Sequence, residues 1–319
     1  IRHWPEYFPV IAPESVPDAV VEGFGCRLPD VYVSAMVARS QSPVWINMEY
    51  LSAESWVDDC HRMASPQPSV PLTKYFFFPG FTAKTGGLFR EADVLERRRQ
   101  FQQDTARRRV FLASLGVVEQ ADCLFSLFCY EHAPIAGLFE ALARQEAKRV
   151  LCLVPEGVAS ASVSAFLRQP ASVGAVRTEG ALTVRVIPFM DQDDYDQLLW
   201  SCDLNFVRGE DSFLRAQWAA RPFVWQAYPQ DEAAHIPKIN AFLERYLAGL
   251  PPDSAECVAR AWQVWNAVGS REEGAAAQAW SAFFGRLHAL TRHGPAWADA
   301  LGQMEDFASS LVWFIDRMR

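Results

Sequence analysis

Short apolar runs that end in turn-forming residues recur along this chain, and segments with helical spacing separate them. Such runs are typical of buried strands in parallel sheets, whose two faces are both covered by helices. The strands predicted in this way span residues 19–24, 44–48, 75–78, 123–128, 149–154, 182–188, 204–207 and 223–226. Alternating strands and helices predict an α/β protein, with a doubly wound parallel sheet in its second half.

The pattern divides into two α/β domains, as the length of 319 residues also favours. We assign residues 1–115 to the first domain, with the charged helical segment 90–115 as a bridge to the second. Residues 116–300 form the second domain. Residues 301–319 form a terminal helix that can pack back on the first domain.

One stretch, residues 204–218, combines a buried strand, a turn at Arg208-Gly209 and a helix that carries Phe213 and Trp218. A helix that begins after such a turn offers backbone N–H groups and a positive dipole to phosphate. Arg208 adds a planar cation that can bind two phosphate oxygens. The sequence therefore predicts a phosphate site at this turn.

Two carboxylates, Glu210 and Asp211, lie in the same turn and would repel a diphosphate if they faced it. Either at least one of them faces sugar hydroxyls, a cationic acceptor or, as a cap, the helix itself, or both only cap the helix and meet solvent. Asp211 or Ser212 can cap that helix, since a short side-chain oxygen accepts from N–H groups of the first turn.

Composition excludes several classes of protein. Half of the residues are hydrophobic, and the net charge of −8 argues against a nucleic-acid partner. The seven cysteines include no Cys-x-x-Cys pair, a pattern typical of a reducing compartment without disulfides or zinc. No apolar run approaches the roughly 20 residues of a membrane span. We therefore expect a cytoplasmic protein without a membrane partner.

Two short motifs resemble known binding motifs. Asp191-Gln192-Asp193 resembles the Asp-x-Asp of metal-dependent sugar transferases, but we favour helix capping by Asp193 or Asp194 and expect no metal. Gly23-Phe24-Gly25 begins like a dinucleotide fingerprint, but Leu28 stands at the third glycine position. A nicotinamide-dependent oxidoreductase is therefore disfavoured, while a non-catalytic protein-binding module remains an alternative.

The first domain also has residues at strand ends, where ligands bind in open α/β sheets. They are Glu49, Tyr50 and the loop 80–88. The alternative is that Tyr50 packs in the core and that Gly86-Gly87 is only a turn.

Several longer motifs carry a family resemblance. They are Arg208-Gly209-Glu210-Asp211-Ser212-Phe213, Arg221-Pro222-Phe223-Val224-Trp225, Tyr228-Pro229-Gln230, Trp45-Ile46-Asn47-Met48-Glu49-Tyr50-Leu51-Ser52-Ala53-Glu54 and Phe76-Phe77-Phe78-Pro79-Gly80-Phe81-Thr82. In this order they resemble the protein-arginine rhamnosyltransferases that mature translation elongation factor P, the EarP family. One departure is that the family's amino-terminal Asp-Asn-Tyr-Gly-Asp-type loop is absent, together with its candidate general-base Asp. We therefore expect this chain to bind the donor but to be catalytically impaired.

The resemblance implies a GT-B glycosyltransferase, with two Rossmann-like domains facing across a cleft and the first of them incomplete here. It implies metal-independent, inverting transfer of L-rhamnose from TDP-β-L-rhamnose to an arginine of elongation factor P, without a cofactor. The modified factor would then rescue ribosomes stalled on polyproline. A nucleotide-sugar-dependent transferase with another acceptor is the alternative.

The resemblance also implies roles for particular side chains. Phe189 would stack on thymine and Gln192 would read the base edge, while Arg208, Asp211 and Ser212 would lie near the diphosphate. Glu210 matches the family's essential glutamate and would orient the sugar or the acceptor. The other side chains implied in donor binding are Phe128, Tyr130 and Tyr228.

Overall fold

The structure, a computed structural model, describes residues 9–146, 148–230, 233–266 and 275–319. The chain divides into two compact units. The first comprises Ile1–Arg90 with Met304–Arg319, and the second comprises Glu91–Gln303. The helical segment that we predicted as a bridge therefore lies in the second unit, and the terminal helix lies in the first.

The first unit contains a four-stranded sheet of order β1-β2-β4-β3. Strands β1, β2 and β4 are parallel, with Ile46 opposite both Val21 and Tyr75, and β3 is an antiparallel edge strand. We did not predict β3, which is only three residues long and mostly exposed. The strands are β1 (Ala19–Gly23), β2 (Val44–Met48), β3 (Ala64–Pro66) and β4 (Thr73–Phe77).

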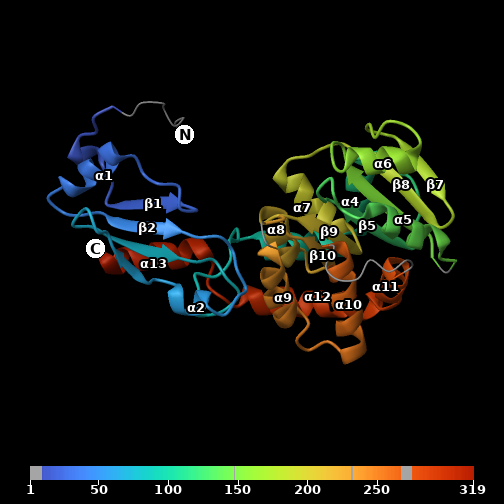
Figure 1. The fold of residues 1–319 in the computed structure, drawn as a ribbon. Coiled ribbons are helices and arrows are strands. Elements are labelled where there is room, and N and C mark those ends of the chain that lie inside the picture. Colours follow the sequence, from blue (N-terminus) through green and yellow to red (C-terminus); the bar gives the residue numbers. More distant parts are fainter. Residues whose placement is uncertain (1–8, 147, 231–232, 267–274) are drawn as a thin grey trace. The chain divides into compact units, whose positions relative to one another are not determined.

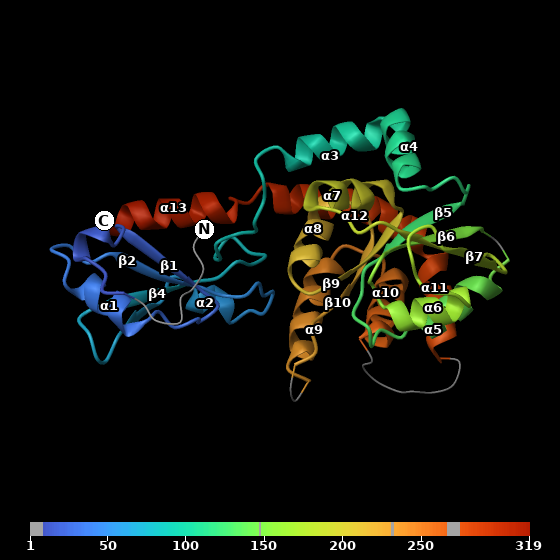
Figure 2. The same cartoon turned by 90° about the horizontal axis from the view of Figure 1, so that it is seen from above.

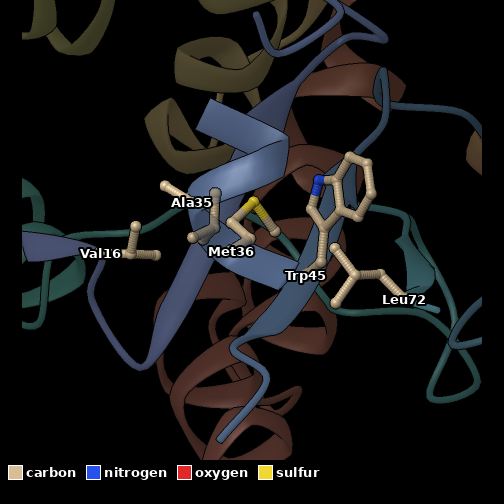
Figure 3. Packing of buried hydrophobic residues seen from close by; sticks show 6 residues of the cluster. Val16, Ala35, Met36, Trp45 and Leu72 are labelled. Carbon is tan, nitrogen blue, oxygen red and sulfur yellow. The ribbon is translucent and has the colours of Figure 1, made fainter. Parts of the chain in front are cut away.

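Helices cover this sheet through two apolar clusters. Figure 3 shows the first cluster, in which Met36 of α1 packs near Trp45 of β2. In the second, Phe307 and Phe314 of α13 pack against Ile46, so the last helix completes the core of the first unit (Figure 1). The helical elements are η1 (Pro13–Ser15), α1 (Asp30–Val37), α2 (Val57–Cys60) and α13 (Phe307–Met318).

The second unit contains a six-stranded sheet of order β10-β9-β5-β6-β8-β7. Its strands are parallel except β7, a polar edge strand that forms a hairpin with β8 and that we did not predict. The predicted parallel sheet is confirmed, with strand ends within one residue of those predicted. The strands are β5 (Cys123–Leu127), β6 (Val150–Pro155), β7 (Val176–Glu179), β8 (Leu182–Ile187), β9 (Leu204–Arg208) and β10 (Phe223–Gln226).

Helices flank the second sheet on both faces. Figure 2 shows α3, α4 and α7 on one side and α5, α6 and α11 on the other. The predicted helix over 90–115 is two helices, because Asp104 adopts an extended conformation and accepts a bond from the Arg107 N–H. The helices are α3 (Val94–Gln103), α4 (Thr105–Ser114), α5 (Ile135–Arg144), α6 (Ser160–Leu167), α7 (Gln192–Ser201), α8 (Asp211–Ala219), α9 (His235–Tyr246), α10 (Pro252–Trp265), α11 (Ala275–Gly285) and α12 (Leu287–Gly302).

The strand order reverses between β5 and β9. From β5 the chain proceeds to β6 and β8 on one side, and β9 and β10 lie on the other. Loops at the carboxyl ends of strands diverge at such a point and leave a crevice.

All seven cysteines are free thiols, and no helix within the described ranges is long and apolar enough to cross a membrane.

Candidate donor-binding pocket

A pocket of about 450 Å³ lies at this reversal point, a volume typical of small-molecule sites. It is formed by the segments that follow β5, β6, β8 and β9. Of the residues predicted in catalytic or donor-binding roles, all except Tyr228 line it, although they are far apart in the sequence. The lining residues are Phe128, Tyr130, Pro155, Phe189, Met190, Asp191, Gln192, Tyr195, Arg208, Gly209, Glu210, Asp211 and Ser212.

Arg208 is held at the end of β9 by two aromatic rings. Its guanidinium carbon lies 4.4 Å from the ring centre of Phe128 and 4.9 Å from that of Tyr130. Its Nη1 donates to the carbonyl oxygen of Cys129 at 3.0 Å. The aromatic faces stabilise the cation and restrict its rotation. Arg208 therefore presents a fixed positive charge in the pocket wall, as binding of an anion requires.

The turn after Arg208 depends on glycine. Gly209 has φ of +61°, and a Cβ at this position would lie 2.9 Å from the Tyr130 hydroxyl. Ser212 stabilises the same turn, since its Oγ accepts from the Arg208 N–H at 2.9 Å and donates to the Arg208 carbonyl at 2.5 Å. The backbone at the pocket floor is thus fixed by hydrogen bonds within the turn.

The predicted capping of α8 by Asp211 or Ser212 is wrong. Glu210 occupies the N-cap position, and its side chain makes no capping hydrogen bond. Ser212 is buried and bonded to Arg208, whereas Asp211 is exposed in the first turn. The first turn of α8 is therefore not closed by a side chain of its own.

Phe189 and Gln192 lie where α7 begins. Phe189 is 66% exposed at the pocket rim, and Gln192 is exposed in the first residue of the helix. The open face of this ring can stack on a nucleobase. These positions agree with a base-binding role, which stays a prediction.

The capping assignment in the Asp-x-Asp motif also needs correction. Asp191 caps α7, since its Oδ1 accepts from the Asp194 N–H at 3.0 Å, and neither Asp193 nor Asp194 is the cap. Asp193 instead pairs with Arg97 at 2.8 Å, and this hydrogen bond lowers the pKa of the Asp193 carboxyl. Within the described residues, no group of three or more His, Cys, Asp or Glu side chains could hold a metal ion.

Sequence analysis missed Tyr195 as a pocket residue. Its ring contacts Phe128, with ring centres 5.6 Å apart, and its hydroxyl is buried. Burial raises the pKa of this phenol. The available signal was helical spacing, because Tyr195 follows Gln192 by three positions and lies on the same helix face.

Tyr228 lies outside the pocket lining. Its ring is 66% exposed and packs edge-on against Tyr130, with ring centres 5.6 Å apart. Tyr228 therefore contacts a residue of the pocket wall, Tyr130, without lining the pocket itself.

The structure rules out the alternative that the strand-end residue Tyr50 packs in the core of the first unit. Tyr50 is exposed and stacks on Phe24, with ring centres 4.4 Å apart, so it does not pack in the core. Burial raises the pKa of Glu49.

Gly87 has φ of +77°, and a Cβ there would collide with the Glu305 carbonyl oxygen. Gly87 thus permits close backbone approach before α13 and is more than a turn residue.

Comparison with known proteins identifies the family of this chain. Residues 1–316 match the family described as Elongation-Factor P (EF-P) rhamnosyltransferase EarP. The protein-arginine rhamnosyltransferase of Pseudomonas putida is 48% identical over 316 residues, covering 98% of this chain and 81% of that protein. The protein-arginine rhamnosyltransferase of Pseudomonas aeruginosa is 48% identical over 305 residues, covering 95% of this chain and 79% of that protein.

A solved structure is also similar. It is described as the structural basis for EarP-mediated arginine glycosylation of translation elongation factor EF-P. Its TM-score is 0.67 at 42% sequence identity, and the match covers 76% of each chain. The family model matches nearly the whole chain, and a relative in this family is 48% identical to it. The chain therefore belongs to the EarP family of elongation factor P rhamnosyltransferases.

Proposed function

We propose that this chain transfers L-rhamnose from TDP-β-L-rhamnose to an arginine of elongation factor P, with inversion and without a metal or cofactor. The proposal includes the biological consequence that the modified factor rescues ribosomes stalled on polyproline. The observation that carries it is the pocket at the β5/β9 reversal, where Arg208, Phe189 and Glu210 converge. Family membership supplies the reaction class.

The base and the diphosphate of the donor each have a matching group in the pocket. We assign the thymine to the exposed Phe189 ring and the Gln192 amide, which has both donor and acceptor groups. We assign the diphosphate to Arg208 and the first turn of α8, where positive charge stabilises the departing TDP. Phe128 and Tyr130 hold Arg208 in place and form the adjoining wall.

The acceptor explains the need for a carboxylate. A guanidinium has a pKa of about 12.5 or above, so it is almost wholly protonated and a poor nucleophile near neutral pH. In the proposed step, a guanidine nitrogen forms a bond to C1 of rhamnose while the bond from C1 to the TDP oxygen breaks. The nitrogen loses a proton to a carboxylate, a role that the family resemblance assigns to the Asp of the amino-terminal loop. Attack opposite the departing TDP inverts the anomeric centre.

Glu210 is one of the three carboxylates that line this pocket, with Asp191 and Asp211. It lies at the N-cap of α8, next to Arg208-Gly209 in the sequence. We assign it to orient the sugar or the acceptor guanidinium, whose positive charge it complements. A carboxylate so close to a diphosphate is unfavourable unless a cation or hydroxyl groups face it.

The test incubates the chain with elongation factor P and TDP-rhamnose, followed by intact-mass measurement and peptide mapping. Because the family resemblance implies that the general-base Asp is absent from this chain, the expected result is a slow gain of one deoxyhexose on an arginine, and joining the family's amino-terminal loop to the chain should accelerate it. Glu210→Gln should abolish the gain, whereas Glu140→Gln, on the exposed face of α5, should leave it unchanged. Activity that persists in EDTA would support metal independence. Modification by the Glu210→Gln chain at the native rate would refute the assignment of Glu210.

The same experiment separates the alternatives. TDP binding without transfer to elongation factor P would favour a transferase with another sugar or acceptor. Absence of TDP binding would favour a protein-binding module.

A further inference from the structure

Tyr130 is a central residue of the pocket wall, yet its backbone position depends on a side chain from another strand. Its ring lies against Arg208, and its hydroxyl lies where a Cβ on Gly209 would collide with it. The N–H of Tyr130 donates to Oε1 of Gln226 at 2.8 Å. Gln226 is the last residue of β10 and is 2% exposed.

Gln226 forms hydrogen bonds with two segments that surround Arg208. Its side chain accepts from Tyr130, and its backbone carbonyl accepts from the Gly209 N–H at 3.0 Å. One residue therefore fixes the spacing between the segment after β5 and the segment after β9. These are the two segments that hold the Arg208 guanidinium.

The orientation of the Gln226 amide is determined by these contacts. Because an N–H of Tyr130 needs an oxygen acceptor, Oε1 must face Tyr130, and the Gln226 amide nitrogen must face His132. That nitrogen lies 3.2 Å from Nε2 of His132. The His132 Nε2 is then the acceptor, which gives the neutral ring its proton on Nδ1. The His132 ring stacks on Tyr130 at 9°, so it supports the same wall.

A second cavity of about 410 Å³ has His132, Gln226, Trp265 and Asn266 among its lining residues. Gln226 and His132 thus line this cavity while they contact Tyr130, which lines the first pocket. Without the amide of Gln226, the N–H of Tyr130 would lose its acceptor.

We infer that Gln226, assisted by His132, is a positioning residue for the donor pocket. It holds Tyr130 and Gly209 at the spacing that keeps the Arg208 guanidinium in place for a nucleoside diphosphate. The identity of this ligand rests on the proposed function. The positioning itself concerns the free protein and can be measured without a ligand.

The experiment compares three variants by amide hydrogen exchange and by TDP titration. Gln226→Met removes the acceptor at similar side-chain length, and Gln226→Glu retains an oxygen for the Tyr130 N–H. Gln217→Met is the matched control, because Gln217 is also fully buried and bonded, donating to Phe213 and accepting from Trp297.

In the free chain, Gln226→Met should accelerate exchange of the Tyr130 amide by about tenfold or more, since its hydrogen bond is lost. It should also weaken TDP binding about tenfold and raise KM for the donor more than it lowers kcat. Gln226→Glu should stay within about threefold of the native affinity. Gln217→Met should lower stability but leave Tyr130 exchange and TDP affinity unchanged.

Native Tyr130 exchange in Gln226→Met would overturn the inference, as would an equal loss of TDP affinity in Gln217→Met. A native chain that fails to bind TDP would refute the proposed function instead. The exchange measurement would still decide the role of Gln226 in that case.

Discussion

Arg215 of α8 and Asp196 of α7 form a buried ion pair that joins the two helices lining the pocket. The Nε of Arg215 donates to Asp196 at 2.7 Å, a second bond links Nη2 to the same carboxylate, and both side chains are almost fully buried. Each residue lies about one helical turn beyond a pocket residue, Gln192 in α7 and Asp211 in α8. The pair therefore fixes the spacing of the two first turns.

Removing one partner of this pair should be costly. Glu91 also accepts from Arg215 at 2.7 Å, and bonds to the two carboxylates outweigh burial and raise the pKa of the guanidinium. Arg215→Met leaves the Asp196 carboxylate buried without its cation, and we expect a loss of about 3–5 kcal/mol in the free energy of unfolding. Chemical denaturation measures this change.

The control for Arg215→Met is Arg144→Met on α5. Arg144 pairs with Glu140 at 2.5 Å, but both side chains are more than half exposed. Solvent screens such a pair, so the expected loss is below about 1 kcal/mol. Similar losses in the two variants would contradict the structural role of the buried pair.

Substitution of Gly209 tests whether Tyr130 must keep its position for the donor to bind. A second glycine with positive φ, Gly174, separates the effect of the backbone conformation from that of the contact with Tyr130. Gly209→Ala introduces a Cβ 2.9 Å from the Tyr130 hydroxyl at a φ of +61°. Gly174→Ala introduces a Cβ at a φ of +87° with nothing within 4 Å. Both variants should lose about 1–2 kcal/mol in stability from the left-handed backbone.

Only Gly209→Ala should weaken TDP binding, by about tenfold, since only this substitution displaces Tyr130 from the pocket wall. Calorimetric titration of TDP measures the difference. If Gly174→Ala weakens binding equally, the effect arises from stability and not from the wall.

The lowered pKa of His61 leads us to predict how the stability of the first unit depends on pH. Burial, with a smaller contribution from the charge of Arg62, lowers the pKa of His61 from 6.5 to about 4. Its Nδ1 accepts from the Phe78 N–H at 3.1 Å, which requires the neutral ring. Below pH 6.5 the unfolded chain binds a proton that the folded chain does not, so the stability falls as the pH falls from about 6.5 to 4.

His61→Asn retains an acceptor near the Phe78 N–H but cannot be protonated. The free energy of unfolding of this variant should decline less between pH 7 and pH 5 than that of the native chain, as urea denaturation at each pH would measure. Parallel pH profiles for the two proteins would show that His61 does not contribute.

The sequence by itself determined the class of fold and the segments of the pocket. Apolar runs at 44–48 and 223–226 match β2 and β10, because strands buried on both faces require continuous hydrophobic residues. Edge strands β3 and β7 were missed because they are short, polar and exposed, and lack that signal. The break at Asp104 was missed because local charge patterns do not reveal a cap within a charged segment.

Only the tertiary structure decided how the site residues are held. The capping predictions for Asp211, Ser212 and Asp193 were wrong because several short polar residues compete at each helix start, and the path of the preceding loop selects among them. Likewise, nothing in the sequence pairs Gln226 with Tyr130. That contact joins residues 96 positions apart and exists only because β10 and β5 lie in one parallel sheet, whose strand ends meet at a common edge.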